Sequence, residues 1–279
     1  MKKNYHILCS DSGASNLIYY WYIANKKKYN FSFDLNGLAK KIFKKKNKKL
    51  NSKIDCIITG TGKIKDKYIE AIEYGKKNNI KTISFLDHYV NYNSRFVYKK
   101  KLILPDEIWT FDNVSFSIAE KFFKITKIKN KKNFYLEFLK KNFKIYQKKI
   151  SKNKNYLNIL FVSEPSLISS SLNKQLAFNI FNFLNKYNKK IKLILRLHPS
   201  EKNNPLLSLI SNKLMNNKNI ILAVDKNLSI LNSLYECDVV IGGETYAMVL
   251  ALKLKKKAYT FLPIKNHQFN LPFAKIKKI

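Results

Sequence analysis

The chain has 279 residues, of which 46% are hydrophobic, and its formal net charge is +36. This length and apolar content suffice for two compact domains, and no apolar run approaches the roughly 18 residues that span a bilayer. The first apolar stretch, Tyr5–Cys9, is interrupted by His6 and has no small-residue cleavage site after it, which argues against a secretory signal. We therefore expect a cytoplasmic protein.

The basic charge comes almost entirely from lysine. Only Arg95 and Arg196 are arginine, so 52 of the 54 basic residues are lysine. Nucleic-acid sites favour arginine for its bidentate contacts, whereas abundant lysine, asparagine and isoleucine are typical of an AT-rich genome. We expect no nucleic-acid partner. The charge still favours peripheral contact with an anionic membrane, at its inner face.

The cysteines and acidic residues give no sign of a metal site. Cys9, Cys56 and Cys237 are isolated in or after apolar runs, which indicates buried free thiols in a reducing compartment. The chain has no Asp-x-Asp pair, no histidine–glutamate cluster at helical spacing and no Gly-x-x-x-x-Gly-Lys-Ser/Thr loop. We therefore expect no metal ion and no cofactor, and a P-loop ATPase is excluded.

Strands and helices alternate along the first half of the chain, the pattern of an α/β fold. The expected strands are Tyr5–Cys9, Phe31–Phe33, Cys56–Thr59, Thr82–Leu86 and Glu107–Phe111. The expected helices are Ala14–Asn25, Leu38–Lys45, Lys67–Asn78 and Val114–Phe123. The lysine-rich segment Lys124–Asn155 shows no strong strand, and we interpret it as the end of this domain with a helical connector.

A second series of strands and helices follows. The expected strands are Leu157–Val162, Lys192–Leu197, Ile220–Ala223, Asp238–Ile241 and Ala258–Leu262. The expected helices are Asn173–Tyr187, Pro205–Met215, Leu228–Tyr235 and Thr245–Leu254. Two such series of similar length predict an α/β protein with two Rossmann-like domains, residues 1–153 and 154–279, that face each other across a cleft.

A turn after one strand of the second domain combines small and polar residues. Gly242 and Gly243 allow the backbone to approach a ligand, Thr245 can cap the following helix, and the helix N-terminus favours an anion. Glu244 in the same turn would suit the hydroxyl groups of a sugar or ribose. The alternative is that Glu244 only stabilises the helix dipole.

Two further strand ends of this domain carry polar side chains. Arg196 and His198 would contact a nucleotide phosphate, with Ser200 available to cap the next helix. Alternatively, the histidine packs under a loop and the arginine lies on a solvated strand end. Ser163 and Glu164 follow the first strand and reach the same edge of the sheet, where a solvated loop is an equal alternative.

In the first domain, Asp11 and Gly13 follow the first strand and open a helix, and Thr59–Gly62 forms a second small-residue turn. The first turn is too loose for a dinucleotide fingerprint. Asp11 is placed to act as a base toward an acceptor, or it serves as the N-cap of the helix.

The segment Leu86–Phe96 concentrates ionisable residues after another strand. Asp87 or His88 would act as general base toward an acceptor hydroxyl, and Arg95 would bind an anion. The alternative is a structural loop whose polar groups satisfy one another.

Three groups of residues resemble known families. The segment Tyr235–Thr245 resembles the last βα unit of GT-B-fold glycosyltransferases. The His198-Pro199 pair resembles the histidine-proline motif of bacterial sialyl- and polysialyltransferases and of CDP-glycerol glycerophosphotransferases. The first domain resembles GT-B-like bacterial proteins through Asp11–Asn16, Leu86–Phe96 and Leu104-Pro105-Asp106.

This resemblance implies that the second domain binds the nucleotide of a donor and the first domain binds an acceptor. It assigns His198 and Glu244-Thr245 to the donor, and Asp11 and His88 to the acceptor. Two further residues of the matching segments, Asn16 and Asn91, also fall on the acceptor side. The family's serine at the last helix is replaced here by Gly243-Glu244-Thr245.

Residues and resemblance together favour a metal-independent glycosyltransferase that uses a nucleotide-sugar donor and a saccharide or lipid-linked acceptor in surface polysaccharide assembly. A sugar-nucleotide epimerase or hydrolase on the same fold is the nearest alternative. A non-catalytic partner in capsule assembly, which binds anionic lipid or polymer through its lysines, is the other.

Overall fold

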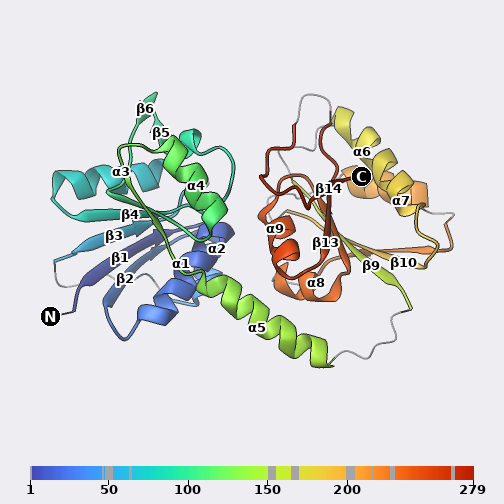
Figure 1. Cartoon of the computed structure of the whole chain (residues 1–279), viewed down its shortest axis with the longest axis horizontal. Coiled ribbons are helices and arrows are strands. Elements are labelled where there is room, and N and C mark those ends of the chain that lie inside the picture. The colour runs from blue at the N-terminus through green and yellow to red at the C-terminus, as the bar shows by residue number, and fades with distance from the viewer. Residues whose placement is uncertain are drawn as a thin grey trace. The chain divides into compact units, whose positions relative to one another are not determined.

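The computed structural model describes residues 2–45, 47, 53–62, 65–149, 155–164, 170–198, 205–214, 217–226, 230–264 and 268–279. The chain forms two compact units, Met1–Phe138 and Leu139–Ile279, each built on a six-stranded sheet (Figure 1). The domain boundary expected between residues 153 and 154 falls outside the described residues. No helix in the described part of the chain is long and apolar enough to cross a bilayer.

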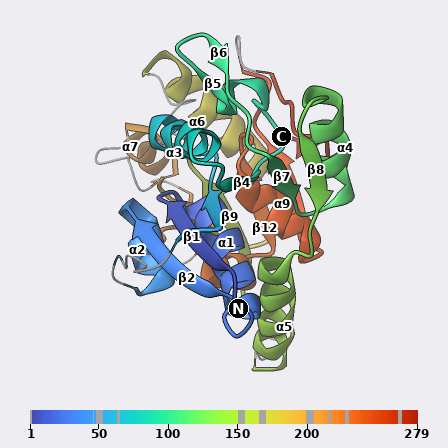
Figure 2. The same cartoon turned by 90° about the vertical axis from the view of Figure 1, so that its left-hand side faces the viewer.

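The first unit contains a parallel sheet with the strand order β2-β1-β3-β4-β7-β8. Its strands are β1 (Asn4–Cys9), β2 (Asn30–Leu35), β3 (Cys56–Thr59), β4 (Lys81–Phe85), β7 (Glu107–Thr110) and β8 (Lys127–Asn130). Its helices are α1 (Ser12–Asn25), α2 (Gly37–Phe43), α3 (Lys65–Lys77), η1 (Asn93–Arg95) and α4 (Asn113–Phe122). A small hairpin pairs β5 (Val97–Tyr98) with β6 (Lys101–Leu102). Helices α1 and α3 lie on opposite faces of the sheet (Figure 2), as right-handed crossovers in opposite directions require.

The second unit contains a parallel sheet with the order β11-β10-β9-β12-β13-β14. Its strands are β9 (Leu157–Val162), β10 (Ile191–Arg196), β11 (Ile220–Val224), β12 (Val239–Gly242), β13 (Lys257–Thr260) and β14 (Lys277–Lys278). Its helices are α6 (Ser170–Leu184), α7 (Pro205–Leu214), α8 (Ile230–Glu236) and α9 (Tyr246–Lys253). Helix α5 (Phe134–Lys149) contains the boundary between the two units.

The central strands of each sheet are apolar and buried on both faces, as is typical of parallel sheets. All four residues of β3 and of β12 are buried. In the first unit, aromatic edges and faces fill the core, with Trp21 5.4 Å from Trp109 and 6.0 Å from Phe85 between ring centroids. The expected α/β architecture with two parallel sheets is therefore confirmed.

Every strand and helix expected from the sequence is present, with ends that differ by a few residues. The segment Lys124–Asn155, in which no strong strand was expected, contains the short strand β8. Strand β8 is a polar edge strand without an apolar run, and it is held by its pairing with β7 and by the ion pair of Lys129 with Glu107 (2.7 Å).

Candidate functional site

Both sheets have a point where the direction of the strand connections reverses, and ligands of open α/β sheets bind beyond the carboxyl ends of the strands at such a point. In the first unit this point lies between β1 and β3, and in the second between β9 and β12. The turns after these four strands carry Asp11, the Gly60–Gly62 segment, Glu164 and the Gly243–Thr245 segment. The predicted turns therefore lie where the topology favours a ligand.

Asp11 lies directly after β1 and caps helix α1. Its Oδ1 accepts the backbone N–H of Ala14 (3.1 Å), and its Oδ2 accepts the hydroxyl of Tyr68 (3.2 Å). The same hydroxyl oxygen accepts the backbone N–H of Ser10 (3.0 Å). A methyl group added to Gly62 would lie 2.1 Å from Asp11 Oδ2, so the glycine is needed for this carboxylate to occupy its place.

Asp87 lies two residues after β4, and two side chains donate hydrogen bonds to it. Arg95 Nη1 and the hydroxyl of Thr61 both donate to Asp87 Oδ1, each at 3.1 Å. Arg95 also donates through Nε to the carbonyl of Val90 (3.2 Å), which ties down the loop. A methyl group on Gly13 would lie 2.1 Å from Asp87 Oδ2 and 3.6 Å from Asp11 Oδ1, so both carboxylates approach the same α-carbon.

The carboxylates of Asp11 and Asp87 lie in different electrostatic surroundings. Burial, and then the nearby charge of Asp87, raise the pKa of Asp11 to about 6, although hydrogen bonds from the Ala14 amide and the Tyr68 hydroxyl oppose this shift. The charge of Asp87 is compensated by Arg95 at 3.1 Å. Near neutral pH, a carboxyl with such a pKa exchanges protons readily, which is what general acid–base catalysis requires.

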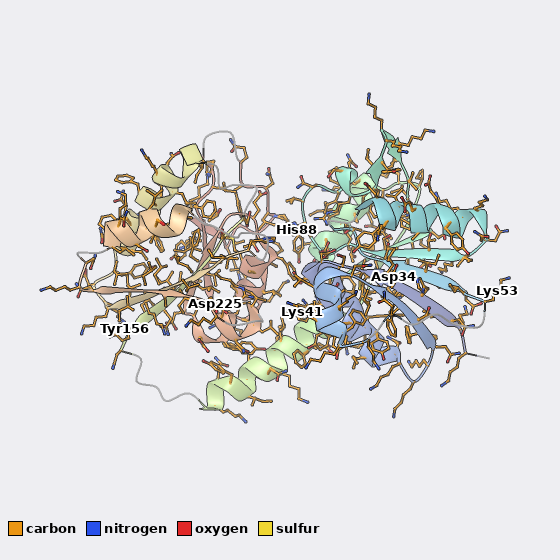
Figure 3. All side chains as sticks on the ribbon, turned by 180° about the vertical axis from the view of Figure 1, so that it is seen from behind. Asp34, Lys41, Lys53, His88, Tyr156 and Asp225 are labelled. Carbon is orange, nitrogen blue, oxygen red and sulfur yellow. The ribbon has the colours of Figure 1, made fainter. Side chains whose placement is uncertain are left out.

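Of the other residues predicted on the first unit, His88 and Asn91 lie on the loop that carries Asp87, and Asn16 lies on the helix that Asp11 caps. His88 is half-buried beside Tyr89, with ring centroids 6.4 Å apart, at the carboxyl edge of the sheet (Figure 3). The side chain of Asn16 donates to the carbonyl of Ser12 (2.7 Å), inside its own helix. Asn91 is exposed and adopts a left-handed backbone conformation with φ 60°.

In the second unit, the N–H groups of the Gly243–Thr245 turn surround a carboxylate of the chain itself. Glu164 Oε1 accepts the backbone N–H of Glu244 at 2.8 Å. Burial raises the pKa of Glu164 to about 7, although hydrogen bonds from the backbone of Glu244, Thr245 and Gly243 oppose the shift. An anionic ligand that used these N–H groups directly would have to displace Glu164.

Hydrogen bonds and close packing also hold the other residues of this turn in place. Thr245 is the N-cap of α9 and accepts the backbone N–H of Ala247 (3.3 Å). Gly242 is buried, and a methyl group there would lie 3.0 Å from Thr245 Cγ2. The side chain of Glu244 accepts the backbone N–H of Asn270, which fastens the last described segment to the turn.

Arg196 is part of a buried ion pair at the end of β10. Its Nη1 lies 2.7 Å from Asp225 Oδ2 and 3.3 Å from the Ser233 hydroxyl. The backbone N–H of Ser163, itself buried, donates to the carbonyl of Arg196 (2.9 Å). His198 is exposed beyond this pair. Ser200, the remaining predicted contact, lies outside the described residues.

Three of these partners could not be predicted from the residue pattern. Tyr68 belongs to the buried face of α3, a position typical of core packing, and its hydroxyl reaches Asp11 only through the fold. Asp225 directly follows β11 and Ser233 lies within α8, so no local pattern pairs either residue with Arg196. No group of three or more His, Cys, Asp or Glu side chains suited to a metal ion occurs in the part of the chain that the structure describes.

No family model and no curated protein sequence matches the chain. Its fold is similar to a UDP-N-acetylglucosamine 2-epimerase from Rickettsia bellii, with 12% identity over 96% of this chain and 81% of that one and a TM-score of 0.67. A UDP-GlcNAc 2-epimerase from Neisseria meningitidis, bound to UDP-GlcNAc, matches with 11% identity over 92% and 82% and a TM-score of 0.65. One from Methanocaldococcus jannaschii matches with 14% identity over 93% and 83% and a TM-score of 0.62.

These similarities support a GT-B-like fold of two parallel-sheet units. They do not support the resemblance to sialyl- and polysialyltransferases or to CDP-glycerol glycerophosphotransferases. They also overturn the glycosyltransferase interpretation of the sequence, because the three solved structures compared above are named UDP-GlcNAc 2-epimerases. The motifs had indicated a nucleotide-type site on a GT-B-like fold, and such a fold serves more than one reaction.

Proposed function

We propose that the protein is a sugar-nucleotide epimerase. The observation that carries the proposal is the pair of Asp11 and Asp87, which meet at the carboxyl edge of the first sheet with unequal surroundings. Inversion of a carbon centre needs a group that takes up a proton and a group that returns one. The similarity of the fold to UDP-GlcNAc 2-epimerases, at 11% to 14% identity, adds the substrate class.

In this proposal, one carboxylate removes the proton at C2 of the sugar while the bond from C1 to the nucleotide diphosphate breaks, so that the electron pair of the C–H bond forms a C1=C2 double bond. The paired carboxylic acid then returns a proton to the opposite face of C2 as the released diphosphate re-forms its bond to C1. The stereocentre inverts, and the atoms of substrate and product are the same. Arg95 keeps Asp87 in place, and Tyr68 and the Ala14 amide keep Asp11 in place. His88, at the same edge, would orient a sugar hydroxyl.

The nucleotide would bind at the carboxyl edge of the second sheet. Two buried glycines, Gly242 and Gly243, leave the backbone close to any ligand there, and His198 is exposed on the neighbouring strand end. Glu164, which occupies the N–H groups of the turn, would accept a hydroxyl of the ribose once its carboxyl is deprotonated. The ion pair of Arg196 with Asp225 would hold the end of β10, two residues before His198, in place.

The test is proton NMR of UDP-GlcNAc incubated with the protein, which distinguishes the two C2 epimers. We expect the second epimer to appear, and Asp11→Asn and Asp87→Asn to slow its formation by about 10²- to 10⁴-fold. Asparagine still caps helices, so Asp11→Asn preserves α1.

Asp55→Asn is the matched control, because Asp55 caps a backbone N–H at the opposite edge of the same sheet (Asn4, 2.7 Å). It should leave the rate unchanged. The proposal fails if UDP-, CDP- and GDP-linked sugars all remain unchanged in the presence of folded protein, or if the control slows the reaction as much as Asp11→Asn.

A further inference from the structure

A cavity of about 1070 Å³ opens at the amino edge of the second sheet, the edge opposite to the Gly243–Thr245 turn. Its apolar lining includes Leu157 and Val239, which begin β9 and β12, and Leu254 after α9. Tyr156, which precedes β9, lies on its wall, and Figure 3 shows this residue and Asp225 at opposite ends of the sheet. The cavity is therefore separate from the candidate nucleotide site.

Lysine dominates the lining of this amino-edge cavity, and Asp238 is the only acidic residue among the lining residues that the structure describes. Eight of the 17 lining residues are lysine, a much larger share than the 52 of 279 in the whole chain, so the enrichment exceeds the general composition. Asp238 already accepts the backbone N–H of Asn158 (2.9 Å). The lysines are Lys140, Lys144, Lys189, Lys190, Lys253, Lys255, Lys256 and Lys257.

One of these lysines, Lys256, connects the segments that line the cavity. Lys256 Nζ donates to the carbonyl oxygens of Tyr235 (3.1 Å) and Cys237, and it lies 4.9 Å from the centre of the Phe143 ring. Phe143 in turn stacks on Tyr235, whose hydroxyl donates to the carbonyl of Leu139 (3.1 Å). The half of α5 that borders the cavity is thus fixed to the second unit.

Six other lining lysines form no ion pair within the described part of the chain: Lys140, Lys144, Lys189, Lys190, Lys255 and Lys257. Like charges gathered around one hollow repel each other and raise the local positive potential. An anion with several charges would relieve this repulsion, and lysine is a common point-charge partner of phosphate.

The shape of the cavity adds to this chemistry. Its volume is comparable to that of sites for drug-sized ligands, which reach about 1,000 Å³. Phe143, Tyr156 and Tyr187 supply aromatic wall between the lysines. A lining that combines apolar, aromatic and lysine side chains suits a small organic molecule with a charged end.

We propose that the amino-edge cavity binds a ligand that carries at least two phosphate groups, either as a soluble molecule or as a lipid headgroup. This site is independent of the epimerase proposal, because it lies at the other edge of the sheet and needs no residue of the candidate active site.

The test compares two variants of equal charge. The cavity variant is Lys144→Gln/Lys189→Gln/Lys190→Gln/Lys255→Asn, in which asparagine suits the left-handed conformation of Lys255 (φ 61°). The control variant is Lys26→Gln/Lys27→Gln/Lys28→Gln/Lys76→Gln, four exposed lysines of the first unit. Calorimetry measures the binding of inorganic tripolyphosphate, and co-sedimentation measures binding to phosphatidylcholine vesicles with and without cardiolipin, which carries two phosphates.

We expect saturable binding of one tripolyphosphate per chain, or binding to cardiolipin vesicles alone if the ligand is a headgroup. The cavity variant should bind the same probe at least about tenfold more weakly, and the control variant should stay within about twofold of the original protein. Equal weakening by both variants would show a general charge effect and overturn the proposal. Binding of neither probe by folded protein would overturn it as well.

Discussion

Replacement of Gly13 by alanine is the sharpest test of the carboxylate arrangement, because two effects predict opposite signs. Gly13 lies in the first turn of α1, where alanine is the better helix former by up to about 1 kcal/mol. However, the new methyl group would lie 2.1 Å from Asp87 Oδ2 and 3.2 Å from Asp87 Cγ. The carboxylate must therefore move away from its partners, Arg95 and Thr61.

The cost of this displacement exceeds the gain in helix propensity. Asp87 and Arg95 have only 11% and 15% of their side chains exposed, so water cannot replace the lost contacts well. Overpacking at such a site costs about 1–3 kcal/mol, and we expect Gly13→Ala to lower the free energy of unfolding by an amount in that range. In an Asp87→Ala background the obstacle is gone, and the same substitution should be neutral or stabilising.

The measurement is a double-mutant cycle by urea denaturation, with the free energy of unfolding of the four proteins compared. Circular dichroism confirms that each variant is folded. If Gly13→Ala stabilised the protein with Asp87 present, or destabilised it equally in both backgrounds, the close approach of Asp87 to this glycine would be refuted.

Three further predictions concern buried charges. Burial alone would raise the pKa of Glu107, but hydrogen bonds from Lys129 and other donors lower it to about 2. The contribution of this carboxylate to the free energy of unfolding is therefore present above pH 4.5 and is lost as pH falls toward 2. Glu107→Gln should remove this pH dependence of the free energy of unfolding, and an unchanged pH profile would contradict the ion pair. Burial raises the pKa of Glu164 to about 7, so stability should decline as pH rises from 4.5 to 7, and thermal unfolding of Glu164→Gln should lack that decline. Asp225→Ala leaves Arg196 without its buried partner and should cost about 3–5 kcal/mol in urea denaturation, whereas a cost below 1 kcal/mol would show that water replaces the pair.

Apolar runs and their spacing were sufficient to predict most of the fold. Strands such as Cys56–Thr59 and Leu157–Val162 are continuous buried segments between turn residues, so sequence and structure agree on them. Strands β8 and β14 could not be predicted, because their residues are mostly polar and their conformation depends on pairing with a neighbouring strand. Edge strands of this kind are defined by tertiary contacts rather than by local pattern.

The candidate site was predictable in its location and less so in its contacts. The strand-end turns with Asp11, Asp87 and Gly243 lie at the edges where the topology favours ligands. The structure shows Asp11 as the N-cap of α1, and its role as a base stays a prediction. The position of Glu164 against the Gly243–Thr245 turn depends on two segments that are 80 residues apart, and no local pattern reports such a contact.

Proton exchange in deuterium oxide tests the central claim most directly. Proton NMR and mass spectrometry of UDP-GlcNAc incubated with the protein in this solvent should show one deuterium at C2 in the epimerised product, because the returned proton comes from a carboxyl group in exchange with solvent. Asp11→Asn should incorporate deuterium far more slowly than Asp55→Asn. Full retention of the C2 proton after prolonged incubation with folded protein would contradict the account.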